Sequence, residues 1–234
     1  MALKQRKFLT TLAAIMVVTT FVIISSGAVV WANGLRFNSS TGSFEQTVLI
    51  AIDGSPQFAD VLLNGNPVAT RIPYRIRNLL PGNYVVEISK TGFQSWKQSF
   101  WLSRGQVGLI NDLTLIATKP LMSLAPSVLK IAQLERLDFG LRLEGGELTD
   151  NGKLITRFSV VPIQAHRFNN YYLYQADNEL RLFLTEGNQD YLIYGAQTTE
   201  KLPLALYPST WQVALTDGLI TKFINLTIPS PASE

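Results

Sequence analysis

The chain has no cysteine and a single histidine, and each scarcity excludes a class of function. Without cysteine there is no disulfide, no thiolate nucleophile and no cysteine-ligated metal. A histidine-dependent zinc site or Ser-His-Asp triad would have to use His166, yet residues 164–170 contain no acid. We therefore expect His166 to be a surface or loop residue, and we expect no metal or other cofactor.

Charge is also scarce, since only 16% of the residues are Asp, Glu, Lys or Arg. The formal net charge of +3 arises at one end, where Lys4, Arg6 and Lys7 precede any acid. The rest of the chain carries equal numbers of basic and acidic residues. Binding to nucleic acid depends on a basic face that displaces counterions from phosphates. A neutral chain beyond residue 7 therefore predicts no nucleic-acid partner.

One long segment carries no charge at all, from Phe8 to Trp31. A helix of 24 residues would be roughly 36 Å long, enough to cross a hydrocarbon layer about 30 Å thick. The basic residues before it place residues 1–7 in the cytoplasm and the remainder outside, by the positive-inside rule. Trp31 lies where an interfacial aromatic anchor is expected. A cleaved signal peptide is the alternative, although the apolar run is longer than usual for one.

Residues 32–43 are polar and rich in Gly and Ser, so we expect a flexible spacer. Short runs of β-branched and aromatic residues follow, as is typical of a mainly β protein. Turn dipeptides separate them, among them Asn64-Gly65, which favours a type I′ hairpin, and Pro81-Gly82, which favours a type II turn. Asp53-Gly54, Thr91-Gly92 and Arg104-Gly105 are further expected turns. The predicted strands are Val48–Ile52, Asp60–Leu63, Tyr74–Asn78, Asn83–Lys90, Trp96–Leu102 and Gln106–Leu115.

The order of motifs in residues 44–116 resembles the PEGA domain family. In that family a Pro-Glu-Gly-Ala stretch leads into a strand with an Asn-Gly or Asp-Gly turn. A Thr-Pro link, a Leu-x-Pro-Gly-x-Tyr turn and a Lys-x-Gly-aromatic turn before Trp follow. Two departures are Gln57-Phe58 in place of Glu-Gly and Ile72 in place of a second Thr. The residues that carry the resemblance are Pro56, Ala59, Asn64, Gly65, Pro73, Pro81, Gly82, Tyr84, Gly92 and Trp96.

The resemblance implies a small β-sandwich-like module of a prokaryotic envelope protein, often found after a single membrane span. It implies no catalytic activity, ligand or cofactor. It covers about a third of the chain, so the rest of the molecule is interpreted from its residues alone.

Residues 117–136 contain Pro120 and Pro126 and are expected to form a linker, with a short helix over Ser127–Arg136. Residues 137–228 are again rich in predicted strands, and residues 229–234 are expected to be a disordered tail. Three Asp-led turns precede strands that end in Phe158, Phe183 and Phe223. These predict hairpins and resemble propeller-type repeats. A β-sandwich or meander, or a partial propeller, would fit this second β domain.

Carboxylate pairs are the remaining source of possible catalysis, as in glycosidases. The candidates are Glu144 with Glu147, Asp177 with Glu179, and Glu186 with Asp190, all beside turn residues. Turns commonly carry acids because acids solvate and cap them. Asp150-Asn151-Gly152 hints at a calcium loop but lacks further oxygen ligands at regular spacing. We therefore expect a non-enzymatic protein.

Aromatic residues cluster in two predicted hairpins. In one, Trp96 and Phe100 alternate with Trp101, so one face is expected to be core and the other exposed. An exposed ring on a neutral surface can bind a glycan or peptide, because a flat ring contributes contact area at little entropic cost. The candidate binding residues are Phe93, Trp96, Trp101, Tyr171 and Tyr172.

Together these features predict a single-pass membrane protein with extracytoplasmic β domains that binds or scaffolds at the cell envelope. Its partners would be the membrane and an envelope protein or glycan. The alternatives are a glycan-binding or glycan-processing protein and a non-enzymatic subunit of a secretion or surface complex.

Overall fold

The computed structural model describes residues 2–39, 41–124 and 140–230. The chain divides into two compact units. The first unit contains residues 1–52, 73–84 and 100–111, and the second contains residues 53–72, 85–99 and 112–234. The expected helix at 127–136 and the tail residues 231–234 lie outside the described part of the chain.

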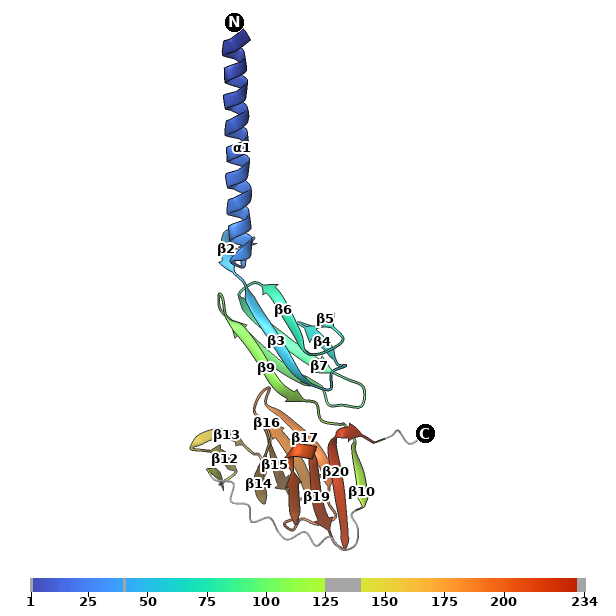
Figure 1. The fold of residues 1–234 in the computed structure, drawn as a ribbon. Coiled ribbons are helices and arrows are strands. Elements are labelled where there is room, and N and C mark those ends of the chain that lie inside the picture. The colour runs from blue at the N-terminus through green and yellow to red at the C-terminus, as the bar shows by residue number, and fades with distance from the viewer. Residues whose placement is uncertain (1, 40, 125–139, 231–234) are drawn as a thin grey trace. The chain divides into compact units, whose positions relative to one another are not determined.

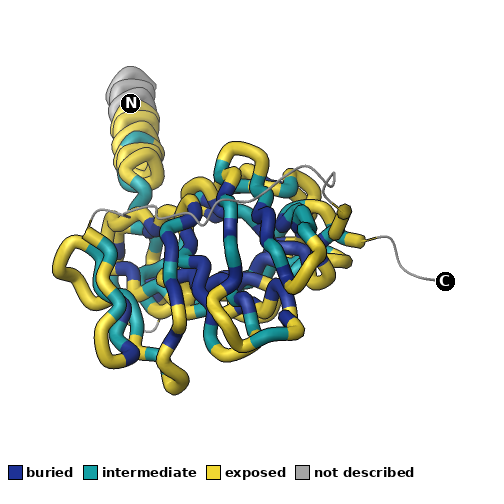
Figure 2. The backbone as a smooth tube through the Cα atoms, turned by 90° about the horizontal axis from the view of Figure 1, so that it is seen from below, coloured by how far each residue is buried: buried dark blue, intermediate teal, exposed yellow. Residues whose placement is uncertain are grey.

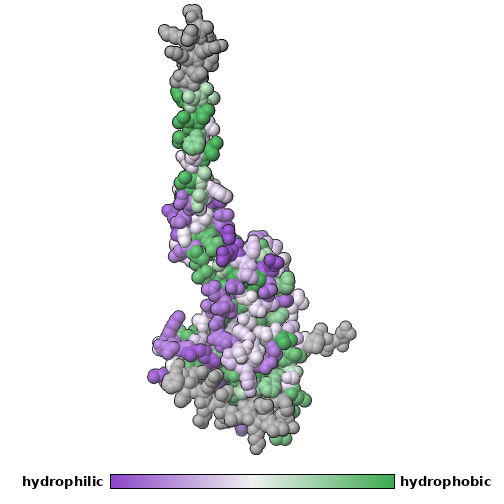
Figure 3. All heavy atoms as spheres, in the orientation of Figure 1, coloured by the Kyte–Doolittle hydropathy of each residue, from purple (hydrophilic) through white to green (hydrophobic). Residues whose placement is uncertain are grey.

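The predicted N-terminal helix is present as α1, Ala2–Ala32. Residues Leu12–Ala32 form a stretch long and apolar enough to cross a membrane, and none of it is buried inside the protein. Figure 2 shows the described part of α1 almost entirely exposed. In Figure 3 the same part is dominated by hydrophobic residues. A helix that is apolar on all sides and packs against nothing is typical of a membrane span.

The expected flexible spacer at 32–43 was wrong, because these residues enter a hairpin. Strand β1, Leu35–Asn38, pairs antiparallel with β2, Ser43–Gln46. Gly42, with a φ of 66°, donates its N–H to the Asn38 carbonyl at 2.8 Å and closes the turn. The Gly and Ser residues that suggested a flexible stalk serve here as turn residues.

The next seven strands form two sheets, as expected for a small β-sandwich (Figure 1). One sheet has the order β6-β3-β9 and the other β5-β4-β7-β8. Within the first unit, a Cβ placed on Gly108 of β9 would meet the side chains of Phe100, Leu102 and Ile50. Strands of the two sheets therefore pack closely there. The strands are β3 (Val48–Ser55), β4 (Asp60–Leu63), β5 (Asn66–Ala69), β6 (Tyr74–Leu79), β7 (Gly82–Ser89), β8 (Trp96–Leu102) and β9 (Val107–Thr114).

All six strands predicted in this region are present, and β5 was not predicted. The Asn64-Gly65 turn between β4 and β5 has the two positive φ angles of type I′, 51° and 80°. The type II turn at Pro81-Gly82 was wrong, because Gly82 begins β7 without a positive φ and Asn78 takes the left-handed conformation instead. The turn at Asp53-Gly54 was also wrong, because β3 continues to Ser55.

The turn before β7 is closed by a side chain. The Tyr84 hydroxyl donates to the Leu80 carbonyl, four residues upstream, at 2.5 Å. A tyrosine that bonds back to the preceding backbone pins the corner of many β-sandwiches. Burial also raises the pKa of this Tyr84 hydroxyl. The tyrosine of the Leu-x-Pro-Gly-x-Tyr motif thus has a structural role.

The C-terminal region forms three further sheets with the orders β11-β12-β13, β14-β15-β16-β17 and β10-β20-β19-β18. The first part of the expected linker is wrong, because β10 lies within it and pairs with β20. The strands are β10 (Pro120–Leu124), β11 (Leu141–Glu144), β12 (Glu147–Asp150), β13 (Lys153–Arg157), β14 (Gln164–Phe168), β15 (Tyr171–Ala176), β16 (Glu179–Leu184), β17 (Gln189–Gly195), β18 (Leu204–Tyr207), β19 (Gln212–Asp217) and β20 (Ile220–Pro229). A 3₁₀ turn, η1, spans Pro208–Thr210.

The three Asp-led hairpins predicted from the sequence repeat are confirmed as β12–β13, β15–β16 and β19–β20. Phe183 lies on β16 and Phe223 on β20, and each of these is an inner strand of a four-stranded sheet. The described strands form separate sheets, and no closed propeller is found among them. The expected tail was wrong for its first two residues, since β20 includes Pro229 and the Ser230 N–H donates to the Lys119 carbonyl at 2.7 Å.

A test of this packing uses two glycines in strands. A Cβ on Gly54 would collide with the Leu113 carbonyl and approach Leu113 Cβ to 2.9 Å, whereas a Cβ on Gly82 would meet nothing within 4 Å. We expect Gly54→Ala to destabilise the protein by about 1–3 kcal/mol through overpacking. Gly82→Ala should be close to neutral. Urea unfolding followed by circular dichroism in detergent measures both, and equal midpoints would contradict the packing of β3 on β9.

Candidate functional site

The aromatic residues predicted for binding divide into core and surface positions. Trp96 and Tyr171 are 0% and 2% exposed, so neither offers a ring to a ligand. Phe93 and Tyr172 are half-buried. Trp101 is 76% exposed, which confirms that β8 has one core face and one solvent face.

Tyr171 is buried because it joins two parts of the second unit. Its hydroxyl donates to the Thr114 carbonyl at 2.5 Å. Its ring makes an edge contact with Trp211, with centroids 5.7 Å apart. Burial, with the nearby Tyr191 and Glu186, strongly raises the pKa of the Tyr171 hydroxyl. This residue is a structural link.

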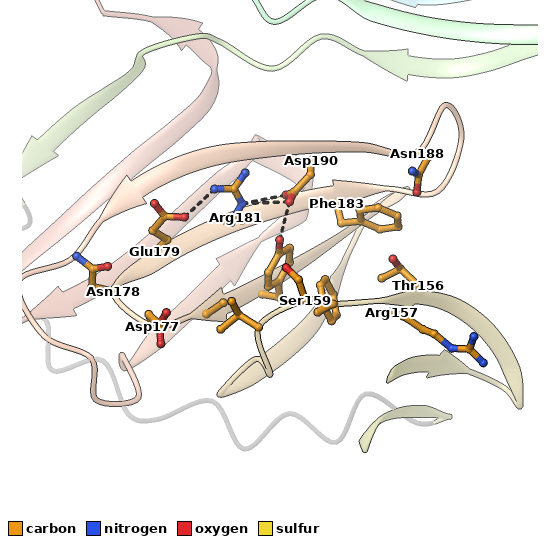
Figure 4. A pocket seen from close by; sticks show the side chains of 14 residues that line it. Thr156, Arg157, Ser159, Asp177, Asn178, Glu179, Arg181, Phe183, Asn188 and Asp190 are labelled. Carbon is orange, nitrogen blue, oxygen red and sulfur yellow. Dashed lines mark hydrogen bonds and ion pairs between the residues drawn. The ribbon is translucent and has the colours of Figure 1, made fainter. Parts of the chain in front are cut away.

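A pocket of about 530 Å³ opens beside the sheet β14–β17 (Figure 4). Arg181 of β16 is one of the residues that line it, between acids from the same strand and from β17. Its Nη1 donates to Glu179 at 2.7 Å and its Nε to Asp190 at 3.1 Å. Phe158 stacks on Tyr174 with ring centroids 4.3 Å apart and supplies an apolar wall.

The Tyr174 hydroxyl completes this cluster by donating to Asp190 Oδ2 at 2.7 Å. Burial and this hydrogen bond to the carboxylate strongly raise the pKa of Tyr174. Asp190 thus accepts from both a phenol and a guanidinium. The pocket presents a fixed set of polar groups beside an aromatic wall, which suits a hydrogen-bonding ligand.

The structure brings Asp177 and Glu179 to the same pocket, together with Asp190. Glu186, the predicted partner of Asp190, lines a different pocket. Glu144 and Glu147 face each other across β11 and β12, and Glu147 pairs with Arg157 at 2.7 Å. Glu147, Glu179 and Asp190 are therefore held in ion pairs with arginines, which a linear sequence does not reveal.

A related Tyr-Asp-cation arrangement occurs twice more, between neighbouring sheets, with the cation bonded to the aspartate at one site and to the tyrosine at the other. Asp150 of β12 accepts from Arg167 of β14 and from the Tyr172 hydroxyl of β15 at 2.9 Å. Burial alone would raise the pKa of Asp150, but the hydrogen bonds from Arg167 and Tyr172 lower it overall. This carboxylate serves a structural contact, and no cluster of three potential metal-binding side chains exists among the described residues.

The third example joins β17 to the sheet of β19 and β20. The Tyr194 hydroxyl donates to Asp217 Oδ2 at 2.8 Å and accepts from Lys222 Nζ at 2.7 Å. Asp217 is 5% exposed, and the Gln197 N–H also donates to it at 3.0 Å. Two of the three turn-leading aspartates found in the sequence repeat, Asp150 and Asp217, therefore tie neighbouring sheets together.

His166 is 7% exposed on β14, so the expected surface or loop position was wrong. Its Nε2 lies 3.2 Å from Gln164 Oε1. Gln164 in turn donates to Gln175 Oε1 at 2.8 Å and to the Leu202 carbonyl at 2.9 Å. His166 thus borders a buried amide network that holds the segment around Leu202 against the sheet.

Sequence reasoning did not select Trp211, which the structure singles out. It has a φ of 54°, the only bulky side chain with a positive φ among the described residues. Such a conformation is rare for a large residue and is often found at functional positions. Trp211 borders a second pocket of about 520 Å³ that is also lined by Asp53 and Asp112. In the sequence, the Pro-Ser-Thr turn directly before Trp211 was the feature that could have pointed to this residue.

The chain was also compared with known proteins. No family model matches it, and no curated protein matches it significantly.

The Asp150–Tyr172 contact predicts an unusual titration. Burial and the adjacent Asp150 carboxylate raise the pKa of Tyr172 to about 12. Because the folded pKa exceeds the ordinary value of 10.0, the stabilisation is complete below pH 10 and is lost as the pH rises through about 12. Tyrosinate absorbance should show a transition near pH 12 that Tyr172→Phe removes. Asp150→Asn should move it to lower pH, and an unmoved transition would contradict the contact.

Proposed function

We propose that this protein is a single-pass membrane protein whose β-rich part lies outside the cytoplasm and acts by binding or scaffolding at the cell envelope. The observation that carries the proposal is the helix Leu12–Ala32, apolar throughout and unburied. Apolar side chains exposed on every side would be unstable in water and are stable in a bilayer. The anchor would hold the β sheets at the membrane.

The charge distribution supports an N-in, C-out orientation. Lys4, Arg6 and Lys7 precede the apolar segment, and the first charges after it are Arg36 and Glu45. Positive charge next to a span is retained on the cytoplasmic side. A neutral β-rich part outside would recognise its partner by shape, hydrogen bonds and aromatic contacts more than by long-range charge.

A PEGA-like identity for residues 44–116 is part of the proposal. Three features support it: the strands follow the expected order, Asn64-Gly65 forms the hairpin turn, and Tyr84 closes the corner before β7. Modules of this kind occur in envelope proteins without a common catalytic function. The resemblance therefore favours a binding or scaffolding role.

The polar groups of the second unit support binding over catalysis. Glu179 and Asp190 both hold Arg181, and His166 is enclosed beside an amide network. A general acid or base needs a free path to its substrate. These groups instead serve as rigid hydrogen-bonding partners within the protein.

Glycan binding is a second candidate, favoured by Trp211 beside Asp53 and Asp112. A tryptophan next to carboxylate acceptors can bind the apolar face and the hydroxyl groups of a sugar. If this pocket binds envelope polysaccharide, Trp211→Leu should strongly reduce retention of the protein on purified peptidoglycan. Trp101→Leu removes an exposed tryptophan elsewhere and should leave retention unchanged. Equal retention of both variants and the wild type would argue against this candidate.

The proposed topology has a direct test because the chain lacks cysteine. A cysteine at the exposed Asn66 should react with a membrane-impermeant maleimide in intact spheroplasts. A cysteine at residue 5 should react only after the membrane is permeabilised. Added protease should also digest the β-rich part in sealed spheroplasts. Protection of Asn66→Cys from both reagents would overturn the orientation.

A further inference from the structure

The hairpin β1–β2 has its apolar face outward and its polar face inward. Phe37 and Phe44 are 58% and 60% exposed, whereas Asn38 and Glu45 are 8% and 5% exposed. A hairpin surrounded by water would normally have the opposite arrangement, with the rings buried and the carboxylate exposed. The inversion indicates that something apolar covers the outer face.

The inner face is held by specific hydrogen bonds within the first unit. Glu45 accepts from Asn38 at 3.0 Å and from Arg104, on the loop between β8 and β9, at 2.8 Å. Thr41 also donates to Glu45 at 3.2 Å, and the hydrogen bonds from Asn38 and Arg104 lower the pKa of Glu45. These contacts fix which face of the hairpin turns inward.

The outer face is one small aromatic surface. Phe37 and Phe44 are direct cross-strand partners, and their rings meet edge to face with centroids 5.5 Å apart. Alternation along the two strands places both rings on the same side. We call this pair the phenylalanine face.

The phenylalanine face lies directly after the end of the apolar helix. The Gly34 N–H donates to the Trp31 carbonyl at 3.1 Å, and the Gly34 carbonyl accepts from Thr47, just beyond β2, at 2.9 Å. The Arg36 guanidinium lies over the Trp31 ring, 5.6 Å from its centroid. Both ends of the hairpin are therefore tied to the last turn of α1, where Trp31 is itself 68% exposed.

We infer that the phenylalanine face, together with Trp31, inserts into the interfacial layer of the bilayer that holds α1. This inference rests on the proposed membrane anchor. Aromatic side chains are favoured at the boundary between hydrocarbon and headgroups. The bilayer then supplies the apolar cover that the hairpin lacks, and lipid contact fixes the hairpin at the membrane surface.

Spin labels test this inference in the full chain reconstituted into phosphatidylcholine–phosphatidylglycerol nanodiscs. Single cysteines replace Phe37 or Phe44, with Ile15 as the reference inside the helix and Trp101 as an exposed reference on β8. Oxygen and a water-soluble nickel complex both relax the spin label. The ratio of relaxation by oxygen to relaxation by the nickel complex increases with the depth of the label in the bilayer. Labels at residues 37 and 44 should show a ratio several-fold above that of Trp101→Cys and below that of Ile15→Cys. Ratios equal to that of Trp101→Cys would overturn the inference.

A second set of variants keeps both rings and reports from a neighbouring position. A label on Ser39→Cys, which is exposed in the hairpin, should also show a raised ratio. Adding Phe37→Ser and Phe44→Ser should return it to the aqueous value, and an unchanged ratio would count against lipid contact by the rings. If the Ile15→Cys label itself behaves as aqueous, the membrane anchor fails and the inference fails with it. If the label at residue 15 has the high ratio of a lipid environment and the labels at residues 37 and 44 have the low ratio of water, the anchor is supported and only the inference is rejected.

Discussion

The C-terminal sheets share one recurring interaction, an aspartate that accepts from a tyrosine hydroxyl, with a cation bonded to the aspartate or to that tyrosine. Asp150 joins β12 to the sheet β14–β17 through Tyr172, and Asp217 joins β19 to the same sheet through Tyr194. Hydrogen bonds to charged groups contribute about 1.5–3 kcal/mol each, and loss of one partner leaves a desolvated charge. A shifted sheet would leave the aspartate buried without its tyrosine partner. These contacts therefore favour one alignment of the neighbouring sheets and also stabilise it. Apolar packing alone is less selective, because hydrophobic residues of similar size can replace one another.

This interaction also limits what the acids can do. Asp190 has a phenol and a guanidinium as partners, so it is part of a closed network around Arg181. The carboxylate is oriented by hydrogen bonds from Tyr174 on β15 and Arg181 on β16. Rigid polar groups beside an aromatic wall favour selective binding, because little entropy is lost when a ligand is ordered there. The network engages the carboxylates within the protein and therefore favours the proposed binding role over acid-base chemistry.

Local signals allowed much of the fold to be predicted. Asp60–Leu63 and Trp96–Leu102 were placed exactly, because alternation and adjacent turn residues act over a few positions. β10 was missed because its strand character depends on pairing with β20, about a hundred residues later, and Pro120 suggested a break. The β1–β2 hairpin was missed because its buried residues are polar, contrary to the usual pattern. The Tyr-Asp-cation sites could not be predicted, since their members come from separate strands and none forms a motif in the chain. Trp211 was missed for a related reason, because its conformation is not encoded in its residue type.

The inverted hairpin and the apolar helix follow from the same physical rule. A side chain is placed according to its surroundings, and in the proposed arrangement the bilayer surrounds the apolar helix and covers the outer face of the hairpin. In hydrocarbon, α1 can expose Leu, Ile and Val on every side, and at the interface the hairpin can expose Phe37 and Phe44. Beyond Gln46 the pattern reverses, with Val48, Ile50 and Ile52 buried and the intervening residues more exposed. In the proposed arrangement, the change in burial pattern between β2 and β3 would mark the boundary between lipid and water. The net charge of +3 lies at the opposite end of the span. The proposal therefore assigns the orientation of the chain to this charge, and the point where the chain leaves the membrane to the aromatic hairpin.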